Sequence, residues 1–224
     1  MSVTAFIPVK CNSSRVPGKN ILPFAKTNLL VHKIRQLKEA ADMGAVSEII
    51  VSSDSDEMLF MAENEKVIAI KRPSDLADES RPFGDFVEYA VGYATKQNLM
   101  WTPVTSPFLN GTFYSLAVDA YEKARAEGYD SLTTVIEFHH FLFDNSGPYN
   151  FSPEKGITNS QDLPDLQLWT CGCSIIPSSL ALKKRYIFGS KPYRLCVSQF
   201  QAIDIDTIYD YKNALEMWRH YNEK

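Results

Sequence analysis

The chain has 224 residues, of which 45% are hydrophobic and 22% charged, a composition typical of a globular protein with one sizeable core. Its net charge of −4 excludes a generally basic surface for nucleic acid, so any anion site must be local. Four cysteines do not make a disulfide framework in this length, and no apolar stretch approaches the roughly 20 residues that a membrane span needs. We therefore expect a single domain over 1–224, with reduced cysteines, in the cytoplasm, and with neither a nucleic-acid nor a membrane partner.

The first part of the chain alternates short apolar runs with amphipathic segments. These patterns predict strands over 4–9, 48–53, 66–70 and 99–104, and helices over 28–43, 57–63, 84–97 and from about Phe113 to Gly128. In the first of these helices we expect Lys33, Arg35 and Lys38 to face water. Strands and helices that alternate at this spacing predict parallel βαβ units.

The second part opens with a predicted strand over 130–138 and then loses its periodicity. Residues 139–165 are dense in Asn, Gly, Pro and Ser, and we interpret them as a long irregular excursion with a short hairpin, 141–143 against 149–151. The remaining patterns predict a strand over 168–177, a short helix to Lys184, an aromatic loop over 186–193, a strand over 197–206 and a helix over 207–221. A segment as long as 139–165 is usually functional or an interaction arm.

A loop with three cations follows the first strand. Lys10, Arg15 and Lys19 share this loop with the hydroxyls of Ser13 and Ser14. Backbone N–H groups and fixed positive charge together suit a polyphosphate. A basic surface turn is the alternative interpretation, and charge alone favours it.

A pair of acids stands near the end of the chain. Asp204 and Asp206 alternate with Ile203 and Ile205 in the predicted strand, so the two carboxylates should point the same way. Two carboxylates on one face form a hard oxygen site suited to Mg²⁺. The alternative for Asp206 is a capping role at the start of the last helix, where Thr207 and Asp210 also lie.

Five blocks, in order, resemble the acylneuraminate cytidylyltransferase family, which includes the CMP-sialic acid synthetases and has the CMP-Kdo synthetases as relatives. The blocks are the Ile-Pro-cation opening with 16–20, then 51–57, 72–77, 105–107 and 203–207. The resemblance implies a Rossmann-like α/β nucleotidyltransferase fold, with a mostly parallel central sheet and helices on both faces. It also implies a homodimer, with 139–165 as a protruding dimerisation or acceptor-binding segment.

The resemblance further implies transfer of CMP from CTP to a small acidic acceptor with release of pyrophosphate, a reaction that needs positioning and charge neutralisation. The implied catalytic residues are Lys10, Lys19 and Asp206, and the implied ligands of Mg²⁺ are Asp204 and Asp206. The implied nucleotide-binding residues are Pro8, Lys10, Ser13, Ser14, Arg15, Lys19, Asn20, Arg72 and Ser80, with Arg72 near the cytosine. The implied acceptor-binding residues are Thr105, Ser106, His140 and Gln161.

Several residues of this sequence differ from the family pattern, mainly at positions that the resemblance assigns to binding of the acceptor. The family usually has Arg where Lys10 stands and two glycines where Cys11 and Asn12 stand. The segment 103–109 lacks the family's Gln and Arg, and Cys171-Gly172 replaces an Asn-Gly. We therefore expect an ulosonic or nonulosonic sugar acid other than plain N-acetylneuraminate, or another acidic acceptor such as a phosphonate.

Two other classes of protein stay open at this point. One is a sugar transferase that uses an Asp-x-Asp metal site, and the other is a non-catalytic nucleotide-binding homologue. The nucleotide hypothesis requires that the cationic loop and the acid pair face each other across one cleft, although more than 180 residues separate Lys19 from Asp204.

Overall fold

The computed structural model describes residues 2–11, 13, 15–77, 80–156 and 159–222. Its main sheet has seven strands in the order β11-β7-β10-β6-β1-β4-β5. The strands are β1 (Val3–Pro8), β4 (Glu48–Ser53), β5 (Ile68–Lys71), β6 (Asn98–Trp101), β7 (Ser131–Phe138), β10 (Leu166–Pro177) and β11 (Pro192–Cys196). Strand β10 runs antiparallel to β6 and β7, and the other neighbours pair in parallel. The predicted α/β fold with a mostly parallel sheet is confirmed.

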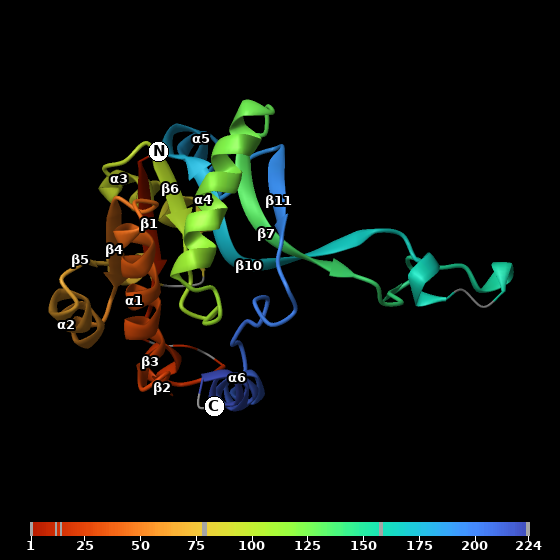
Figure 1. Ribbon diagram of the computed structural model, residues 1–224, viewed down its shortest axis with the longest axis horizontal. Coiled ribbons are helices and arrows are strands. Elements are labelled where there is room, and N and C mark those ends of the chain that lie inside the picture. The colour runs from red at the N-terminus through yellow and green to blue at the C-terminus, as the bar shows by residue number, and fades with distance from the viewer. Residues whose placement is uncertain (1, 12, 14, 78–79, 157–158, 223–224) are drawn as a thin grey trace.

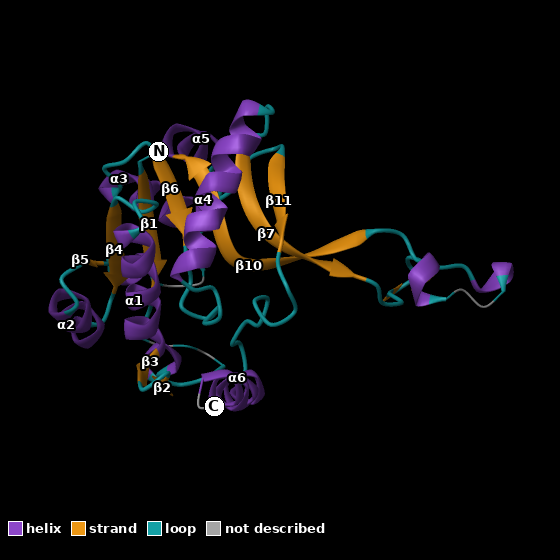
Figure 2. Ribbon diagram, in the orientation of Figure 1, coloured by secondary structure: helices purple, strands orange, loops and turns teal. Residues whose placement is uncertain are grey.

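Helices cover both faces of this sheet (Figure 2). They are α1 (Leu29–Asp42), α2 (Asp56–Asn64), α3 (Phe83–Tyr93), α4 (Gly111–Ala126), α5 (Ser178–Lys184) and α6 (Ile208–Asn222). One apolar core lies between the sheet and α1, α2 and α4, and a second lies between the sheet and α3 and α5. The α2 helix begins where the sequence predicts, because the Ser55 side chain accepts the N–H of Met58. Within the described ranges, no helix is long and apolar enough to cross a bilayer.

Short elements complete the description. They are the strands β2 (Pro23–Phe24), β3 (Thr27–Asn28), β8 (Phe143–Asp144) and β9 (Gly147–Pro148), and the 3-10 helices η1 (Lys19–Ile21), η2 (Ser74–Leu76), η3 (Pro153–Lys155) and η4 (Ser160–Asp162). The β2–β3 pair lies beside α6, and the Tyr211 hydroxyl of that helix donates to the Pro23 carbonyl at 2.6 Å (Figure 1).

The predicted strand over 197–206 is wrong. The last edge strand is β11, which ends at Cys196 and lies partly in the segment we expected to be an aromatic loop. The chain then leaves the sheet in a turn, where the side-chain oxygen of Gln201 accepts the N–H of Ser198 at 3.1 Å. The alternation of apolar and acidic residues up to Asp206 belongs instead to a segment outside any strand, in which Ile205 is buried and donates its N–H to the Thr105 carbonyl at 2.8 Å.

An arm projects from the sheet between β7 and β10 (Figure 1). These two strands stay paired beyond the body of the sheet, with Leu166 opposite Phe138. Past them, Phe143–Asp144 pairs with Gly147–Pro148, a tighter hairpin than the one we predicted. The Phe143 and Tyr149 side chains on the arm are 69% and 65% exposed, so large aromatic groups face solvent there.

Candidate active site

The loop after β1 is held by bonds at both of its ends. The Asn20 side-chain amide donates to the Lys10 carbonyl at 2.8 Å, and the Cys11 N–H donates to Asp54 at 2.7 Å. Gly18 has φ 63°, a left-handed conformation that glycine adopts at little cost, and it leads directly into η1 at Lys19. The described ends of this loop, at Lys10–Cys11 and at Asn20, are therefore anchored by these bonds.

The cationic loop meets the acid pair. Lys19 Nζ donates to the Ile205 carbonyl at 2.7 Å and lies 3.4 Å from Asp206 Oδ1. The same carboxylate oxygen lies 2.7 Å from Arg15 Nη2. Lys19 is only 8% exposed, so solvent screens its interaction with Asp206 weakly. The juxtaposition that the nucleotide hypothesis requires is thus present, although the roles of these residues stay predictions.

Capping does not account for Asp206. Thr207 and Asp210 cap α6 between themselves, since the Thr207 N–H donates to Asp210 Oδ2 at 2.7 Å and the Asp210 N–H donates to Thr207 Oγ1 at 3.3 Å. Asp206 joins this arrangement through its backbone N–H, which lies 3.1 Å from the same Asp210 oxygen. Its carboxylate faces Arg15 and Lys19 instead.

Asp204 is the more buried member of the acid pair. Burial raises the pKa of its carboxyl; a hydrogen bond from Thr105 opposes that rise, and the nearby Asp206 charge adds to it. Its Oδ1 is buried and has no hydrogen-bond partner among the described residues. A buried carboxylate oxygen without a partner is costly, and a cation beside it would remove that cost. The pair therefore fits a hard divalent cation.

Two protein carboxylates do not fill the coordination shell of such a cation. Among the described residues, no group of three or more His, Cys, Asp and Glu side chains is placed to hold a metal ion. An ion at Asp204 and Asp206 would take its other oxygens from water and substrate, which is the usual arrangement for Mg²⁺ in phosphate chemistry.

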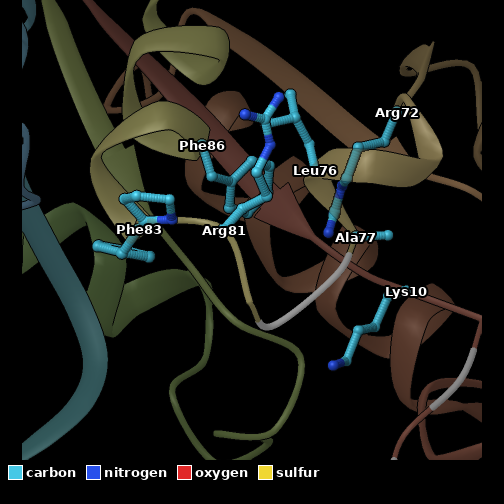
Figure 3. Close-up of a pocket in the computed structure, with 8 residues that line it drawn as sticks. Lys10, Arg72, Leu76, Ala77, Arg81, Phe83 and Phe86 are labelled. Atoms are coloured by element: carbon cyan, nitrogen blue, oxygen red, sulfur yellow. The ribbon is translucent and has the colours of Figure 1, made fainter.

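Two pockets meet at Lys10 and Arg72. The cationic pocket, about 220 Å³, is lined by Pro8, Lys10, Ser13, Arg15, Lys19, Asn20, Arg72 and Thr105. The aromatic pocket, about 300 Å³, is lined by Lys10, Arg72, Leu76, Ala77, Arg81, Pro82, Phe83 and Phe86 (Figure 3). One hollow offers charge for phosphates, and the other offers a ring-sized space against Phe83 and Phe86.

Arg72 forms the wall between these pockets and is only 4% exposed, so it is not a surface cation. Its Nη2 donates to the carbonyls of Val9 and Ser52 at 2.8 and 2.7 Å, which ties together the ends of β1 and β4. The guanidinium lies 4.2 Å from the ring centre of Phe86. Burial lowers the pKa of Arg72 to about 10, which leaves it protonated at neutral pH.

Several expected residues are not brought into these pockets. Ser106 is 2% exposed and is not among the residues that line either pocket. His140 and Gln161 lie on the arm, which projects away from the body, and neither pocket is lined by an arm residue. Ser80 is exposed and lines neither pocket, and Ser14 lies outside the described residues.

Sequence reasoning missed residues on the far side of the aromatic pocket. Arg81 and Phe83 line it, and Arg81 pairs with Asp75 at 2.6 Å. The sequence does contain a signal for these residues, because a cation and an aromatic residue flank Pro82 directly after an acid-rich segment.

The architecture defines the class of protein first. The chain superposes on CMP:2-keto-3-deoxy-manno-octonic acid synthetase complexed with CTP, with a TM-score of 0.66, 14% identity and coverage of 99% of this chain and 100% of the other. It also superposes on 4-diphosphocytidyl-2C-methyl-D-erythritol synthase from Anaerococcus prevotii, with a TM-score of 0.68, 12% identity and coverage of 97% and 98%. The fold is therefore that of the Rossmann-like nucleotidyltransferases.

Sequence similarity narrows the class to a family. Residues 4–157 match the profile of the Cytidylyltransferase family, and the chain belongs to that family. It is 26% identical to the pseudaminic acid cytidylyltransferase of Campylobacter jejuni over 236 residues, which cover 100% of this chain and 99% of the relative. It is 29% identical to the N-acylneuraminate cytidylyltransferase of Escherichia coli O18:K1:H7, covering 99% of this chain and 53% of that longer protein.

Proposed function

We propose that this enzyme transfers CMP from CTP to a nonulosonic sugar acid and releases pyrophosphate, with Mg²⁺ as its cofactor. The observation that carries the proposal is the contact of Asp206 with Arg15 and Lys19, two of the cations that line the cationic pocket. Cations and acids that share one cleft can hold a triphosphate and its metal ion together.

The cationic pocket supplies charge neutralisation. Lys10, Arg15 and Lys19 would bind the triphosphate oxygens, while Asp204 and Asp206 would hold Mg²⁺, which neutralises phosphate charge when bound. The acceptor hydroxyl then attacks the α-phosphorus, the bond to pyrophosphate breaks, and the hydroxyl proton passes to water. Fixed charges stabilise the negative charge that develops on the departing pyrophosphate.

The aromatic pocket would receive the nucleobase. Phe83 and Phe86 offer flat apolar surfaces, and Arg72 and Arg81 offer N–H donors for ring carbonyls. Because Arg72 already donates to Val9 and Ser52, its position is set before a nucleotide arrives.

The acceptor would lie beside the acids, near the bend in β10 at Cys171. The charges of Asp204 and Asp206 act on this thiol, and burial raises its pKa to about 11, so the thiol is neutral at physiological pH. Thr105 is the one expected acceptor residue that lines the cleft. A pseudaminic acid cytidylyltransferase is among the relatives that match along their whole length, so we propose that compound or a related nonulosonic sugar acid as the acceptor.

The arm would complete the acceptor site from a second copy of the chain. His140 and Gln161 are remote from their own cleft, and Phe143 and Tyr149 expose aromatic surface that a partner could cover. We therefore propose a homodimer in which each arm reaches the partner's acceptor region. We also propose a cytoplasmic enzyme, in keeping with the four free cysteines.

A panel of acceptors tests the proposal. The protein is incubated with CTP and Mg²⁺ and with pseudaminic acid, N-acetylneuraminic acid, Kdo or a phosphonate, and pyrophosphate and the CMP product are measured. We expect release with pseudaminic acid, little release with N-acetylneuraminic acid, and no release when UTP replaces CTP.

Other outcomes would favour the rival classes. CTP binding without turnover for any acceptor would indicate a non-catalytic homologue. Consumption of a nucleotide-sugar without pyrophosphate release would indicate a sugar transferase. Pyrophosphate release with the phosphonate and with no sugar acid would support the cytidylyltransferase reaction and would show that the acceptor is a phosphonate.

A further inference from the structure

Helix α1 directs polar side chains onto the turn between β6 and α4. Lys33 Nζ donates to the Ser106 carbonyl at 2.8 Å. His32 Nε2 and Gln36 Nε2 lie 2.9 and 2.7 Å from the next carbonyl, that of Pro107. Two consecutive carbonyls of this turn are thus fixed by one helix.

Lys33 was expected to face water, and that expectation is wrong, because the side chain is 0% exposed. Leu29 and Leu37, one helical turn away on either side, are fully buried, so position 33 falls in the apolar stripe of α1. Besides Ser106, the ammonium contacts the Tyr114 hydroxyl at 2.5 Å and lies 4.9 Å from the centre of that ring.

A lysine in this position costs stability. Burial lowers the pKa of Lys33 to about 7, and no ion pair with a carboxylate is found for it in the described part of the chain. An apolar side chain of the same length would pack here without the cost of desolvating an amine. The presence of a lysine here is therefore better explained by the groups that it holds than by packing alone.

The Ser106 carbonyl that Lys33 holds is adjacent in sequence to a residue that contacts the acid pair. The residue before Ser106 is Thr105, whose carbonyl accepts the Ile205 N–H at 2.8 Å. The Thr105 side chain also hydrogen-bonds the Asp204 carboxylate. Lys33 on one side and Asp204 on the other are thus joined through a segment of two residues.

We propose that Lys33 is a positioning residue for the metal site: it fixes the Ser106 carbonyl, thereby sets Thr105, and so orients Asp204 toward the cation. The inference rests on the proposed function, since it treats Asp204 as a ligand of Mg²⁺. Groups that orient a metal ligand without touching the metal typically change metal affinity by about 10- to 100-fold when removed.

The test compares Lys33→Met with Leu37→Val, a buried apolar control on the same helix. A Lys33→Met/Tyr114→Phe variant serves if the single change does not fold, because it removes the phenol left without its amine partner. Circular dichroism establishes that each protein is folded at the assay temperature. Mn²⁺ binding in the presence of CTP is then measured by electron paramagnetic resonance, alongside the Mg²⁺ concentration that gives half-maximal pyrophosphate release.

We expect the Lys33 variant to bind Mn²⁺ about tenfold or more weakly than the wild type, and the Leu37 control to stay within about twofold. We also expect Thr105→Val to weaken Mn²⁺ binding to a similar degree. The Lys33→Met/Thr105→Val double variant should bind Mn²⁺ no more weakly than the single variant with the lower affinity, because both residues act on Asp204 through the same segment. A merely structural role would give additive losses of stability and no coupled change in Mn²⁺ affinity.

Equal Mn²⁺ affinity in the folded Lys33 and Leu37 variants would overturn the inference. A wild type that binds Mn²⁺ with CTP but releases no pyrophosphate with any acceptor would overturn the proposed function instead. The measurement of Mn²⁺ affinity therefore distinguishes a failure of the inference about Lys33 from a failure of the proposed function.

Discussion

The cleft and the arm are built in opposite ways. In the cleft, bonds join residues that are distant in sequence: Arg15 and Asp206, 191 positions apart, are paired at 2.7 Å. On the arm, bonds join near neighbours, such as the Asn150 side chain with Leu142 and His140. Polar groups in the cleft face partners in the same chain, whereas large aromatic side chains on the arm face solvent.

This difference indicates which of the two substrate sites, that for CTP or that for the acceptor, a single chain can form alone. The cationic and aromatic pockets are formed by the body of a single chain, so we expect CTP to bind without help from a partner. Among the described residues, the arm shows no comparable set of side-chain contacts with its own body, and its aromatic groups are typical of a surface that another protein covers. The acceptor half should therefore depend on a second copy.

The largest effect should follow from breaking the cleft. Asp206→Asn removes a proposed metal ligand and the acid that faces Arg15 and Lys19, and we expect kcat to fall roughly a hundredfold or more. The exposed acid Asp119 on α4 gives the control, Asp119→Asn, which should keep wild-type turnover. Pyrophosphate release measures both, and full activity in the Asp206 variant would remove the metal assignment.

The next effect concerns the arm. Phe143→Glu places a charge on an exposed aromatic position of the arm, and we expect the dimer dissociation constant to rise about tenfold or more. Leu116→Glu changes an equally exposed apolar residue on α4 and should leave assembly unaltered. Sedimentation velocity over a concentration series measures both, and an unchanged dimer in the Phe143 variant would refute the interface.

Mixing variants would sharpen the comparison. A protein with Asp206→Asn has a broken cleft and an intact arm, and one with His140→Ala/Gln161→Ala has the reverse. If arms act on the partner's cleft, mixed dimers regain turnover that neither parent shows. A mixture no more active than its parents would place both functions within one chain.

A smaller effect should follow at the bend of β10. A Cβ on Gly172 would lie 2.7 Å from Leu109 Cδ1 and 3.3 Å from Ser106 Oγ, so Gly172→Ala should destabilise the protein by about 1–3 kcal/mol. Gly92, inside α3, has no atom within 4 Å of such a Cβ, and Gly92→Ala should be neutral or stabilising by up to about 1 kcal/mol. Urea unfolding distinguishes the pair, and equal stabilities would contradict the close packing of the turn.

The smallest effect is a pH dependence. The folded pKa of Lys33, about 7, lies below its ordinary value of 10.5, so between these values the unfolded chain binds more protons and stability rises with pH. The wild type should gain up to about 1.4 kcal/mol per pH unit relative to Lys33→Met in this range. The neighbouring Tyr114 and Cys173, whose pKa values are raised by burial, are common to both proteins. Parallel stability curves from pH 7 to 8.5 would contradict the burial of an amine here.

Sequence alone was enough for most of the sheet, because β1 and β4 each centre on three or more consecutive apolar residues and α1 is flanked by a capping Asn28 and by Gly44. Sequence alone was not enough for 197–206. Alternation of apolar and polar residues there indicates that one side of the segment is buried, but it does not indicate whether a neighbouring strand is available for pairing. Sequence reasoning also brought Lys19 and Asp206 together only through the family resemblance, since no local pattern encodes a contact across 187 positions.

Lys33 shows a different limit of prediction. A charge on a helix is assigned to water by default, and only its spacing of four from Leu29 and from Leu37 indicates the buried face. The arm residues show a third limit, because a chain's own sequence does not say whether His140 acts on its own cleft or on another's.

Strand β10 is one continuous element of 12 residues that starts on the arm and ends at α5, with Cys171 in a left-handed conformation at φ 58° where its register shifts. Successive side chains of a strand alternate between faces, so one residue inserted or deleted between Leu166 and the bend would turn every side chain up to it onto the opposite face. The base of the arm should therefore tolerate no change of length, whereas the part of the arm beyond the paired strands is not bound by this alternation. Natural variation in loop size among such enzymes should accordingly gather beyond the paired strands, where an added residue does not reverse the faces of β10.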